Sequence, residues 1–469
     1  MTSDLDQAAP AGAETPGIAT TVAALRATFA SGRTRDAEWR IRQLTGIERL
    51  LDEREDEIAR ALAEDLGRSP AEAWLGDVAS TKAEATFARK RVRKWMKRKR
   101  VPLSLGSLPG RGWYQYEPLG LVLVIGPWNY PVYLSLAPLV AAIAAGNCVV
   151  VKPSEHAPAS SRLLARLIPE YLDTDAVTVV EGEAEVTQAL LAQGFDHALF
   201  TGGTEIGKRV MAGAAPHLTP VTLELGGKSP VIITRNADIE VAARRIAWVK
   251  LMNSGQICIA PDYVLVEDVV REEFVDALVA TIRKFRADQE SPTTPIVNAR
   301  QFQRLAGLLE TSDGTVACGG GSDPDTLGIE PTVLVDPSPD SPVMADEIFG
   351  PILPVLTVDS LDDAIAFVNA RPKPLASYLF TSDADERDRV LAEVSSGGAV
   401  VNHVAVHCLE PQLPFGGVGN SGIGAYHGRW GFETFSHRKA VLAKPSRPDP
   451  TFIYPPYNSL KLALMRRFF

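Results

Sequence analysis

Short apolar runs alternate with amphipathic segments from residue 119 onward, and this alternation constrains the fold more than any other feature. The first series of apolar runs occupies residues 119–125, 148–151, 176–180 and 198–201. Helical spacing is found between them, at residues 134–145, 159–172 and 186–193, and again from Glu205. Strands that are continuous hydrophobic runs are typical of a parallel sheet covered by helices on both faces. The chain is therefore predicted to contain a Rossmann-like α/β domain.

A second α/β series follows Glu224. Its predicted strands are residues 231–233, 263–266, 333–335, 352–358, 376–380 and 399–402. Its predicted helices are residues 238–252, 272–286, 362–369 and 386–394. Because 469 residues are too many for one ordinary core, this series indicates a second sheet domain. Glu224 then lies at the border of two domains, where ligand-binding clefts are frequent.

The composition excludes several classes of protein. The content of 45% hydrophobic and 22% charged residues is that of an ordinary soluble protein, and the net charge of -9 argues against a general nucleic-acid binder. The four cysteines, Cys148, Cys258, Cys318 and Cys408, are far apart and form no CxxC pair. This spacing disfavours a disulfide scaffold and a zinc site, so we expect no metal and a reducing, cytoplasmic location.

Neither the start of this sequence nor its longest apolar run resembles a targeting or membrane segment. Residues 1–17 lack the basic start and apolar centre of a signal peptide and are predicted to be a disordered tail. The longest apolar run, residues 134–145, is too short to cross a bilayer. No transmembrane span is expected.

Three helical segments precede the first predicted strand. Helical spacing is found at residues 18–31 and 40–66, and a third helix carries Trp74 and Phe87. Nine of the twelve residues from Arg89 to Arg100 are Lys or Arg. An anionic partner or membrane surface is one interpretation of this basic run. We favour a solvated helix end, where cations meet the negative end of the helix dipole, because no aromatic platform accompanies the run.

Cys258 lies on a loop just after a predicted amphipathic helix, and Glu224 lies at the other end of the same stretch. A thiol has an ordinary pKa near ~8.5, so a modestly electropositive setting produces nucleophilic thiolate at neutral pH. A nearby carboxylate can activate water in a later step. The alternative is that Cys258 is a small buried hydrophobe and Glu224 a surface carboxylate beside a Gly-Gly turn, which is the commoner case for a lone cysteine.

Polar residues follow three strands of the first series. Asn129, after the first strand, can offer its amide to a negative oxygen, although a turn-forming Asn needs no function. Lys152 and Glu155, after the second, suit the hydroxyls of a ribose, or form a surface ion pair. The glycine-rich segment 200–208 follows the last strand and opens a helix, where a phosphate can bind. Its spacing is not the GxGxxG of the standard dinucleotide fingerprint.

Seven motifs in order resemble those of the aldehyde dehydrogenase superfamily, and the resemblance covers nearly the whole chain from about residue 20. They are PWNYP at residues 127–131, KPSE at 152–155, FTGGTEIGK at 200–208, ELGGK at 224–228, GQICIAPDY at 255–263, EIFGP at 347–351 and PFGGVGNSGIGAYHG at 414–428. PWNYP, APDY and GAYHG are similar to the class-3 branch of fatty-aldehyde and aromatic-aldehyde enzymes. The resemblance implies medium-chain, long-chain or aromatic aldehydes as substrates.

The resemblance also implies roles for the residues considered above. Cys258 would add to the aldehyde carbon and give a thiohemiacetal, whose oxyanion the Asn129 amide and the Cys258 N–H would hold. Hydride transfer to nicotinamide would leave a thioester, and Glu224 would activate the water that hydrolyses it. The residues implied to hold NAD are Lys152 and Glu155 at the adenosine ribose, Gly202, Gly203, Thr204 and Gly207 at the pyrophosphate, and Glu347 and Phe349 at the nicotinamide ribose. Glu155 would repel a 2′-phosphate, which favours NAD, although class-3 relatives often use NADP.

The same resemblance implies a division into domains and a homodimer. Residues 101–117 are rich in glycine and proline and are predicted to form a protruding hairpin or linker. Family members pair through such an element. The implied division is a cofactor-binding domain at 18–100 and 117–223, a catalytic domain at 224–427, a bridging element at 101–116 and 428–450, and a C-terminal tail at 451–469.

Two other functions are considered. In a CoA-acylating dehydrogenase a thiol removes the acyl group, and the hydrolytic base Glu224 disfavours that reaction. A catalytically silent relative would be expected to lose Cys258, Glu224 or Asn129, and all three are present. The walls of the substrate tunnel are harder to assign, with Tyr133, Met252, Ile257 and His407 as candidates.

Overall fold

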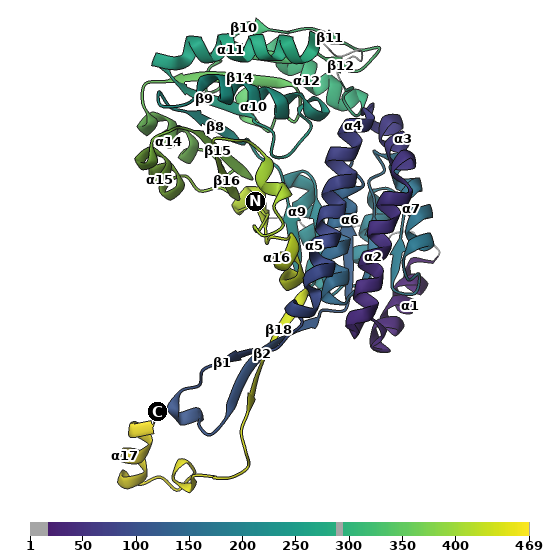
Figure 1. The fold of residues 1–469 in the computed structure, drawn as a ribbon, viewed down its shortest axis with the longest axis vertical. Helices are drawn as coiled ribbons and strands as arrows, with labels where there is room; N and C mark the ends of the chain where they lie inside the picture. Colours follow the sequence, from purple (N-terminus) through teal and green to yellow (C-terminus); the bar gives the residue numbers. More distant parts are fainter. Residues whose placement is uncertain (1–16, 288–293, 469) are drawn as a thin grey trace, which may run out of the picture.

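The computed structural model describes residues 17–287 and 294–468, so the predicted tail at residues 1–17 lies outside it except for Gly17. Two α/β lobes face each other, and a narrow arm extends away from both (Figure 1). Each lobe contains one large sheet and the arm contains a third, smaller one. The predicted fold class, two α/β domains with a small additional β element, is confirmed.

The first sheet has the order β17-β7-β6-β3-β4-β5. Its strands are β3 (Leu121–Ile125), β4 (Cys148–Lys152), β5 (Val177–Val179), β6 (His197–Thr201), β7 (Val221–Glu224) and β17 (Gly422–Ile423). The first five are parallel, and only β17 runs antiparallel, beside β7. The strand order reverses between β3 and β6, which is where ligands bind in open α/β sheets. The range 224–427, expected to be the catalytic domain, therefore contributes the strand β17 to the sheet of the other lobe.

Helices cover both faces of the first sheet. Right-handed crossovers place α6 (Tyr133–Ala145) and α7 (Pro158–Tyr171) on one face, and α8 (Ala184–Leu191) and α9 (Thr204–Ala214) on the other. Helices from the start of the chain pack outside α6 and α7. They are α2 (Ala37–Glu53), α3 (Glu55–Leu66) and α5 (Ser80–Trp95), with α1 (Ile18–Ala30) and the short α4 (Pro70–Ala73) beside them.

The N-terminal helices differ from the prediction in two places. The helix expected at residues 40–66 is two helices, because the chain breaks at Arg54 and the acidic first turn of α3 starts again at Glu55. The third helix begins with a π-helical turn, Trp74–Ala79. The basic run is also divided, since α5 ends at Trp95 and strand β1 begins at Lys99. Part of it is paired, as with Arg89 and Glu48 at 2.9 Å.

The second sheet has the order β10-β13-β14-β9-β8-β15-β16. Its strands are β8 (Pro230–Ile233), β9 (Tyr263–Glu267), β10 (Thr315–Cys318), β13 (Thr332–Val335), β14 (Ile352–Val358), β15 (Ala376–Phe380) and β16 (Gly398–Val401), and only β10 is antiparallel. Its helices are α10 (Ile239–Leu251), α11 (Asp268–Ala287), α12 (Ala299–Thr311), α13 (Pro342–Ala345), α14 (Leu361–Asn369) and α15 (Ala384–Glu393). A two-stranded ribbon of β11 (Ser322–Asp323) and β12 (Gly328–Ile329) accompanies it.

The arm is a three-stranded antiparallel sheet of β1 (Lys99–Val101), β2 (Arg111–Pro118) and β18 (Ser436–Ala443). Strands β1 and β2 pair antiparallel where a protruding hairpin or linker was predicted near residues 101–117, and α17 (Ser459–Phe468) lies at the far end of the arm (Figure 1). The start of the range 428–450, expected to belong to the same element, instead forms α16 (Gly428–Thr434) on the first lobe. Gly431 explains this packing, because a Cβ there would lie 2.7 Å from the Cβ of Ala141 on α6.

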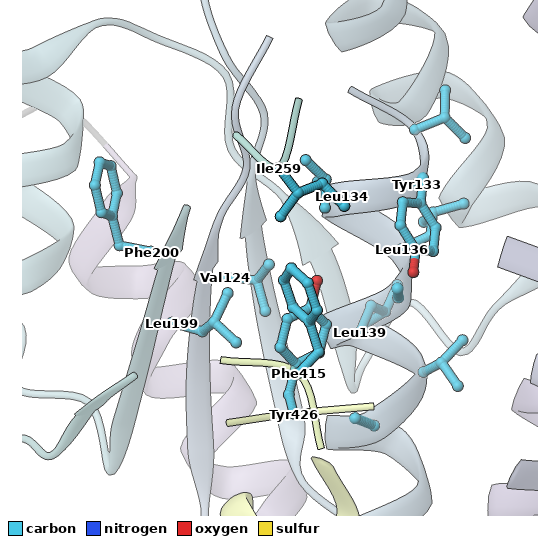
Figure 2. Packing of buried hydrophobic residues seen from close by; sticks show 14 of the residues in the cluster. Val124, Tyr133, Leu134, Leu136, Leu139, Leu199, Phe200, Ile259, Phe415 and Tyr426 are labelled. Atoms are coloured by element: carbon cyan, nitrogen blue, oxygen red, sulfur yellow. The ribbon is translucent and has the colours of Figure 1, made fainter. Parts of the chain in front are cut away.

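The core of the first lobe is built from strand and helix side chains that are almost completely buried. Figure 2 shows Val124 and Leu199 on neighbouring strands and Leu139 on α6. Phe415 and Tyr426, from the late part of the chain, pack into the same cluster and exchange two main-chain hydrogen bonds of 3.0 and 2.8 Å. The segment that follows the second sheet therefore returns to complete the core of the first lobe. No helix in the described ranges is long and apolar enough to cross a membrane.

Asn147, in the turn between α6 and β4, is fully buried and bonds to three main-chain groups. Its Oδ1 accepts from the Gly120 N–H at 2.9 Å, and its Nδ2 donates to the carbonyls of Ala142 and Phe435 at 3.1 and 2.9 Å. We predict that Asn147→Ala lowers the free energy of unfolding by about 2–4 kcal/mol, because buried main-chain groups lose their partners. Denaturant unfolding measures this change. Gln188→Ala, an exposed amide on α8, should change it by less than about 0.5 kcal/mol, and equal losses in the two variants would contradict the assignment.

Candidate active site

The carboxyl edge of the first sheet faces the amino edge of the second. Glu224 is the last residue of β7, and β8 of the second sheet begins only six residues later, at Pro230. Cys258 precedes β9 by a short loop. The end of one sheet and the beginning of the other therefore meet, and polar residues from both lobes are brought to one place.

One cavity, here called the interlobe pocket, lies between these edges. Asn129, Glu224 and Cys258 all line it, so the structure brings together the three residues that the sequence predicts to be catalytic. Most of the remaining lining is apolar, including Leu134, Trp248, Met252, Ile259, Val404 and Phe415. Such a pocket suits a ligand with a hydrophobic body and one polar reacting group.

Cys258 is half-buried and follows an unusual turn. Asn253, Ser254 and Gly255 all have positive φ, at 49°, 51° and 70°. Burial raises the pKa of the Cys258 thiol above its ordinary range, and the nearby Glu347, Cys408 and Glu224 raise it further. The protein's own side chains therefore give the thiol no electropositive setting, because it lies among apolar and acidic groups.

Glu224 is 3% exposed, and neither of its carboxyl oxygens has a hydrogen-bond partner. Burial raises its pKa well above the ordinary value, because the charged form loses its hydration. Across the ladder it pairs with Thr201 of β6, which also lines the pocket and whose hydroxyl also has no partner. A buried, unpartnered carboxyl group is costly for stability and is typical of a functional site.

Asn129 lies in the turn after β3 and is 4% exposed. Its Nδ2 donates to the main-chain carbonyl of Gln256 at 3.1 Å. The side-chain amide of Asn253 in turn donates to the Asn129 carbonyl at 3.2 Å. These bonds cross between the lobes and orient the Asn129 amide, whose second N–H can donate to a ligand oxygen in the pocket.

The residues predicted to hold a dinucleotide lie outside the interlobe pocket. Lys152 is buried at the end of β4, and its Nζ is 2.6 Å from Glu155 Oε2. Gly203 occupies the N-cap position of α9, but no side chain in the described ranges bonds to the free N–H groups of this helix end. A Cβ at Gly203 would meet nothing within 4 Å. A Cβ at Gly207 would lie 2.6 Å from the Leu225 side chain, so this glycine allows α9 to pack closely. The open, uncapped helix end beside Thr204 fits a phosphate group.

Glu347 and Phe349 precede β14 at the amino edge of the second sheet. A Cβ at Gly226 would lie 1.9 Å from Glu347 Oε2, so glycine there lets Glu347 lie against the main chain. Burial, followed by the charge of Asp262, raises the pKa of Glu347 to about 8. Phe349 has a positive φ of 47° and contacts the Trp128 ring edge-on, with centroids 5.4 Å apart. Strain of this kind in an ordered loop is typical of ligand sites.

Two further motif residues hold this loop in place. Lys228 forms an ion pair with Asp262 and donates to the carbonyls of Val343 and Asp346, both at 2.9 Å. The second carboxyl oxygen of Asp262 accepts from the Ile348 N–H at 2.9 Å. The conformation of Glu347 and Phe349 therefore depends on residues of the ELGGK and APDY motifs.

Sequence reasoning identified part of the pocket wall and missed the rest. Tyr133, Met252 and Ile257 line the interlobe pocket as predicted, whereas His407 is not among the lining residues. His427 lines it without having been predicted; its Nε2 lies 3.3 Å from the Tyr133 hydroxyl and its Nδ1 lies 3.4 Å from Glu84. The GAYHG motif is the signal that could have pointed to it. Burial lowers the pKa of His427 to about 3, so the imidazole is neutral at physiological pH.

The other cysteines differ in how they lie relative to the pocket. All four cysteines are free, and Cys408 lines the pocket together with Cys258. Cys148 is buried in β4, as its apolar surroundings predict. Within residues 17–287 and 294–468, no group of three or more His, Cys, Asp or Glu side chains is arranged to hold a metal ion.

Comparison with known proteins identifies the family. The sequence model of the "Aldehyde dehydrogenase family" matches residues 7–441. The human "Aldehyde dehydrogenase family 3 member B1" is 46% identical over 450 residues, which cover 95% of this chain and 96% of the relative. The "Aldehyde dehydrogenase, dimeric NADP-preferring" of Rattus norvegicus is 46% identical over 430 residues, 91% of this chain and 94% of the relative.

A solved structure supports the same conclusion. The "Substrate bound state of Staphylococcus Aureus AldH" superposes with a TM-score of 0.93 at 42% identity, covering 96% of this chain and 99% of that one. The resemblance inferred from the seven motifs, including its class-3-like character, is thereby confirmed. The chain belongs to the aldehyde dehydrogenase family and is an oxidoreductase that oxidises aldehydes with NAD or NADP.

Proposed function

We propose that the chain oxidises medium-chain, long-chain or aromatic aldehydes to carboxylic acids through a covalent intermediate on Cys258. The observation that carries the proposal is the interlobe pocket, in which Cys258, Glu224 and Asn129 share a wall that is otherwise almost wholly apolar. An apolar wall favours a hydrophobic aldehyde, because burial of its carbon atoms contributes to binding. The first lobe would bind the cofactor, and the second would carry the nucleophile.

In the first step the Cys258 sulfur forms a bond to the aldehyde carbon, and the electrons of the carbonyl double bond move to its oxygen. Because the pKa of the thiol is raised, its proton is lost as the carbon–sulfur bond forms and passes to water. The second N–H of the Asn129 amide and the Cys258 N–H would stabilise the oxyanion. Donors fixed in advance act strongly in a pocket from which water is excluded.

The residues beside the uncapped end of α9 fit a dinucleotide, with Lys152 and Glu155 at one ribose and Glu347 and Phe349 at the other. A bound nicotinamide would supply the acceptor for the hydride that leaves the substrate carbon. Cys258 is then left as a thioester.

Glu224 removes a proton from water, and the resulting hydroxide attacks the thioester carbonyl. The carbon–sulfur bond breaks, the carboxylic acid leaves and the Cys258 thiol is restored. A carboxyl group with a raised pKa is a stronger base than an ordinary one, which suits this task. A CoA-acylating enzyme would need no such base in its pocket.

We predict that Glu224→Gln retains a first turnover of NADH but releases the acid at least ~100-fold more slowly, since a general base contributes about 10²–10⁴-fold. Rapid-mixing measurements with hexanal, decanal and benzaldehyde should show a burst of NADH followed by a slow phase. Cys258→Ala should bind NAD and show neither phase. A Glu224→Gln enzyme whose burst and slow phase both match the wild type would exclude the role in hydrolysis.

The pH dependence of the slow phase follows from the raised pKa of Glu224. Only the deprotonated carboxylate can accept a proton from water, so acid release should accelerate as the pH rises towards that pKa and fall as the pH is lowered. Glu224→Gln should lose this dependence. The same profile in both enzymes would assign the titration to another group.

Glu155 supports a preference for NAD. Its carboxylate, paired with Lys152, would lie beside the adenosine ribose and repel a 2′-phosphate. Some use of NADP is expected as well, since the rat relative is named NADP-preferring.

We predict that Glu155→Ala raises the ratio of kcat/KM for NADP to that for NAD about tenfold, or ~1.4 kcal/mol. Glu272→Ala, an exposed acid on α11, is the control, and an unchanged ratio in both would place the 2′-hydroxyl elsewhere.

The arm supports a homodimer. It stands away from both lobes and carries exposed apolar side chains, with Leu105 72% and Leu442 53% exposed. The outer edge of β18 is also unpaired in the described sheet, and such edges are usually covered. The rat relative is named dimeric.

We predict that Leu105→Asp with Leu442→Asp shifts a dimer to a monomer in analytical ultracentrifugation. Leu218→Asp, 89% exposed on the first lobe, should not, and a monomeric wild type would exclude the proposal.

A further inference from the structure

A buried arginine, Arg68, lies where the two lobes meet and bonds to a different partner through each of its three nitrogens. It is 3% exposed, in the short link between α3 and α4. Its Nη1 pairs with Asp77 Oδ2 at 2.6 Å, its Nη2 donates to the main-chain carbonyl of Asn129, and its Nε donates to Asn253 Oδ1 at 3.3 Å. One planar group therefore contacts the chain segments that carry the oxyanion donor and the turn before the nucleophile.

Asp77 fixes the other side of Asn129. Its Oδ1 accepts from the main-chain N–H groups of Val132 and Tyr133, at 3.0 and 2.9 Å. The carboxylate itself is fully buried within the π-helical turn Trp74–Ala79. Single π-helical turns are frequent at functional sites. The ion pair thus holds the chain on both sides of the Asn129 turn, from its carbonyl to the start of α6.

Tyr130 completes the surroundings of the guanidinium. Its ring lies under Arg68, with the Cζ atom 3.9 Å from the ring centroid. Gly76 leaves the space for that ring, because a Cβ there would lie 2.6 Å from a Tyr130 carbon. A planar cation is therefore required by this stack as well as by the three bonds, and a lysine could not replace it without loss.

The contact with Asn253 reaches a strained part of the second lobe. Asn253 and Ser254 both have left-handed backbone conformations, which are unfavourable for residues other than glycine. The Asn253 side chain accepts from Arg68 and donates to the carbonyls of Asn129 and Gln256, both at 3.2 Å. Gln256 also accepts from the Asn129 amide, at 3.1 Å. The turn before Cys258 and the turn carrying Asn129 are therefore held by one continuous set of buried bonds.

We propose that Arg68, anchored by Asp77, is a positioning residue that sets the Asn129 amide in register with Cys258 across the two lobes. This inference rests on the proposed function, in which that amide holds the oxyanion formed on Cys258. Arg68 does not line the interlobe pocket, so it acts on the reaction only through the residues that it contacts, chiefly Asn129 and Asn253. A displacement of about 1 Å in such a constellation can cost about 100-fold in rate.

A second buried arginine provides the matched control. Arg40 is 4% exposed and donates to the carbonyls of Thr34, Arg35 and Ala144, at 3.2, 3.2 and 2.9 Å. Like Arg68 it bonds to three partners, but all three lie in the first lobe and none of them lines the interlobe pocket. Arg40→Lys should therefore show the effect of disturbing a buried arginine on stability alone.

The experiment compares Arg68→Lys, Asn129→Ala and the double variant, using two readouts. The first is aldehyde oxidation with NAD. The second is hydrolysis of p-nitrophenyl acetate without any cofactor, which requires only Cys258, the oxyanion donors and a base. We expect Arg68→Lys to lower kcat about 10- to 100-fold in both assays, with KM for NAD within about threefold of the wild type. The double variant should be no slower than Asn129→Ala, because both changes remove one interaction.

Three results would overturn the inference. They are a wild-type kcat in Arg68→Lys, a kcat loss in Arg40→Lys as large as that in Arg68→Lys, or losses that multiply in the double variant. If Arg68→Lys does not fold, Asn253→Ala replaces it, and a wild-type kcat in that variant overturns the inference equally. An inactive wild type, or an active Cys258→Ala, would instead remove the proposed function.

Discussion

The interlobe pocket depends on one topological constraint, the meeting of the carboxyl edge of one parallel sheet with the amino edge of another. The chain passes from β7 to β8 through a few residues, so Glu224 and the second sheet cannot separate. The strand order of the first sheet reverses between β3 and β6, which places Asn129 and the start of α9 on either side of the reversal. Reactive groups from distant parts of the sequence are thus brought to one place by the strand ends, and the turns that carry Asn129 and Cys258 then set their exact positions.

The charge distribution around Cys258 is the opposite of the usual one for a reactive thiol. Glu224 and Glu347 lie close enough to Cys258 to raise the pKa of its thiol. Burial raises the pKa of all three groups. Each group is therefore disfavoured as an anion in the protein alone. Because a thiol is a weaker nucleophile than a thiolate, the reaction proposed above requires Cys258 to lose its proton as the carbon–sulfur bond forms.

The sequence was sufficient to predict the sheets, the arm and the three polar residues of the pocket, and the reasons are local. Buried parallel strands are continuous apolar runs, and the polar residues Glu224 and Asn129 of the pocket lie at the end of β7 and shortly after the end of β3. Arg68 could not be found in this way, because a single arginine between two helices has no periodic signal and its partners are up to 185 residues away. His427 was visible as part of a motif, but its contacts with Tyr133 and Glu84 arise only on folding. The charge of the Cys258 environment could not be predicted from the sequence, because it depends on Glu224, Cys408 and Glu347, which only folding brings close to the thiol.

Arg68 and Glu224 show two different uses of burial in the same site. Glu224 is buried without hydrogen-bond partners, so its charged form is high in free energy and its pKa is raised. Arg68 and Asp77 are buried but are hydrogen-bonded to each other and to neighbouring groups. These bonds fix their positions and leave them unreactive. Replacing a buried ion pair by apolar residues is often neutral for stability, so stability alone gives little reason to keep this pair. A better reason to keep the pair is that the planar guanidinium contacts both lobes. Without it, the strained turn at Asn253 and the Asn129 amide would be held by contacts of the second lobe alone.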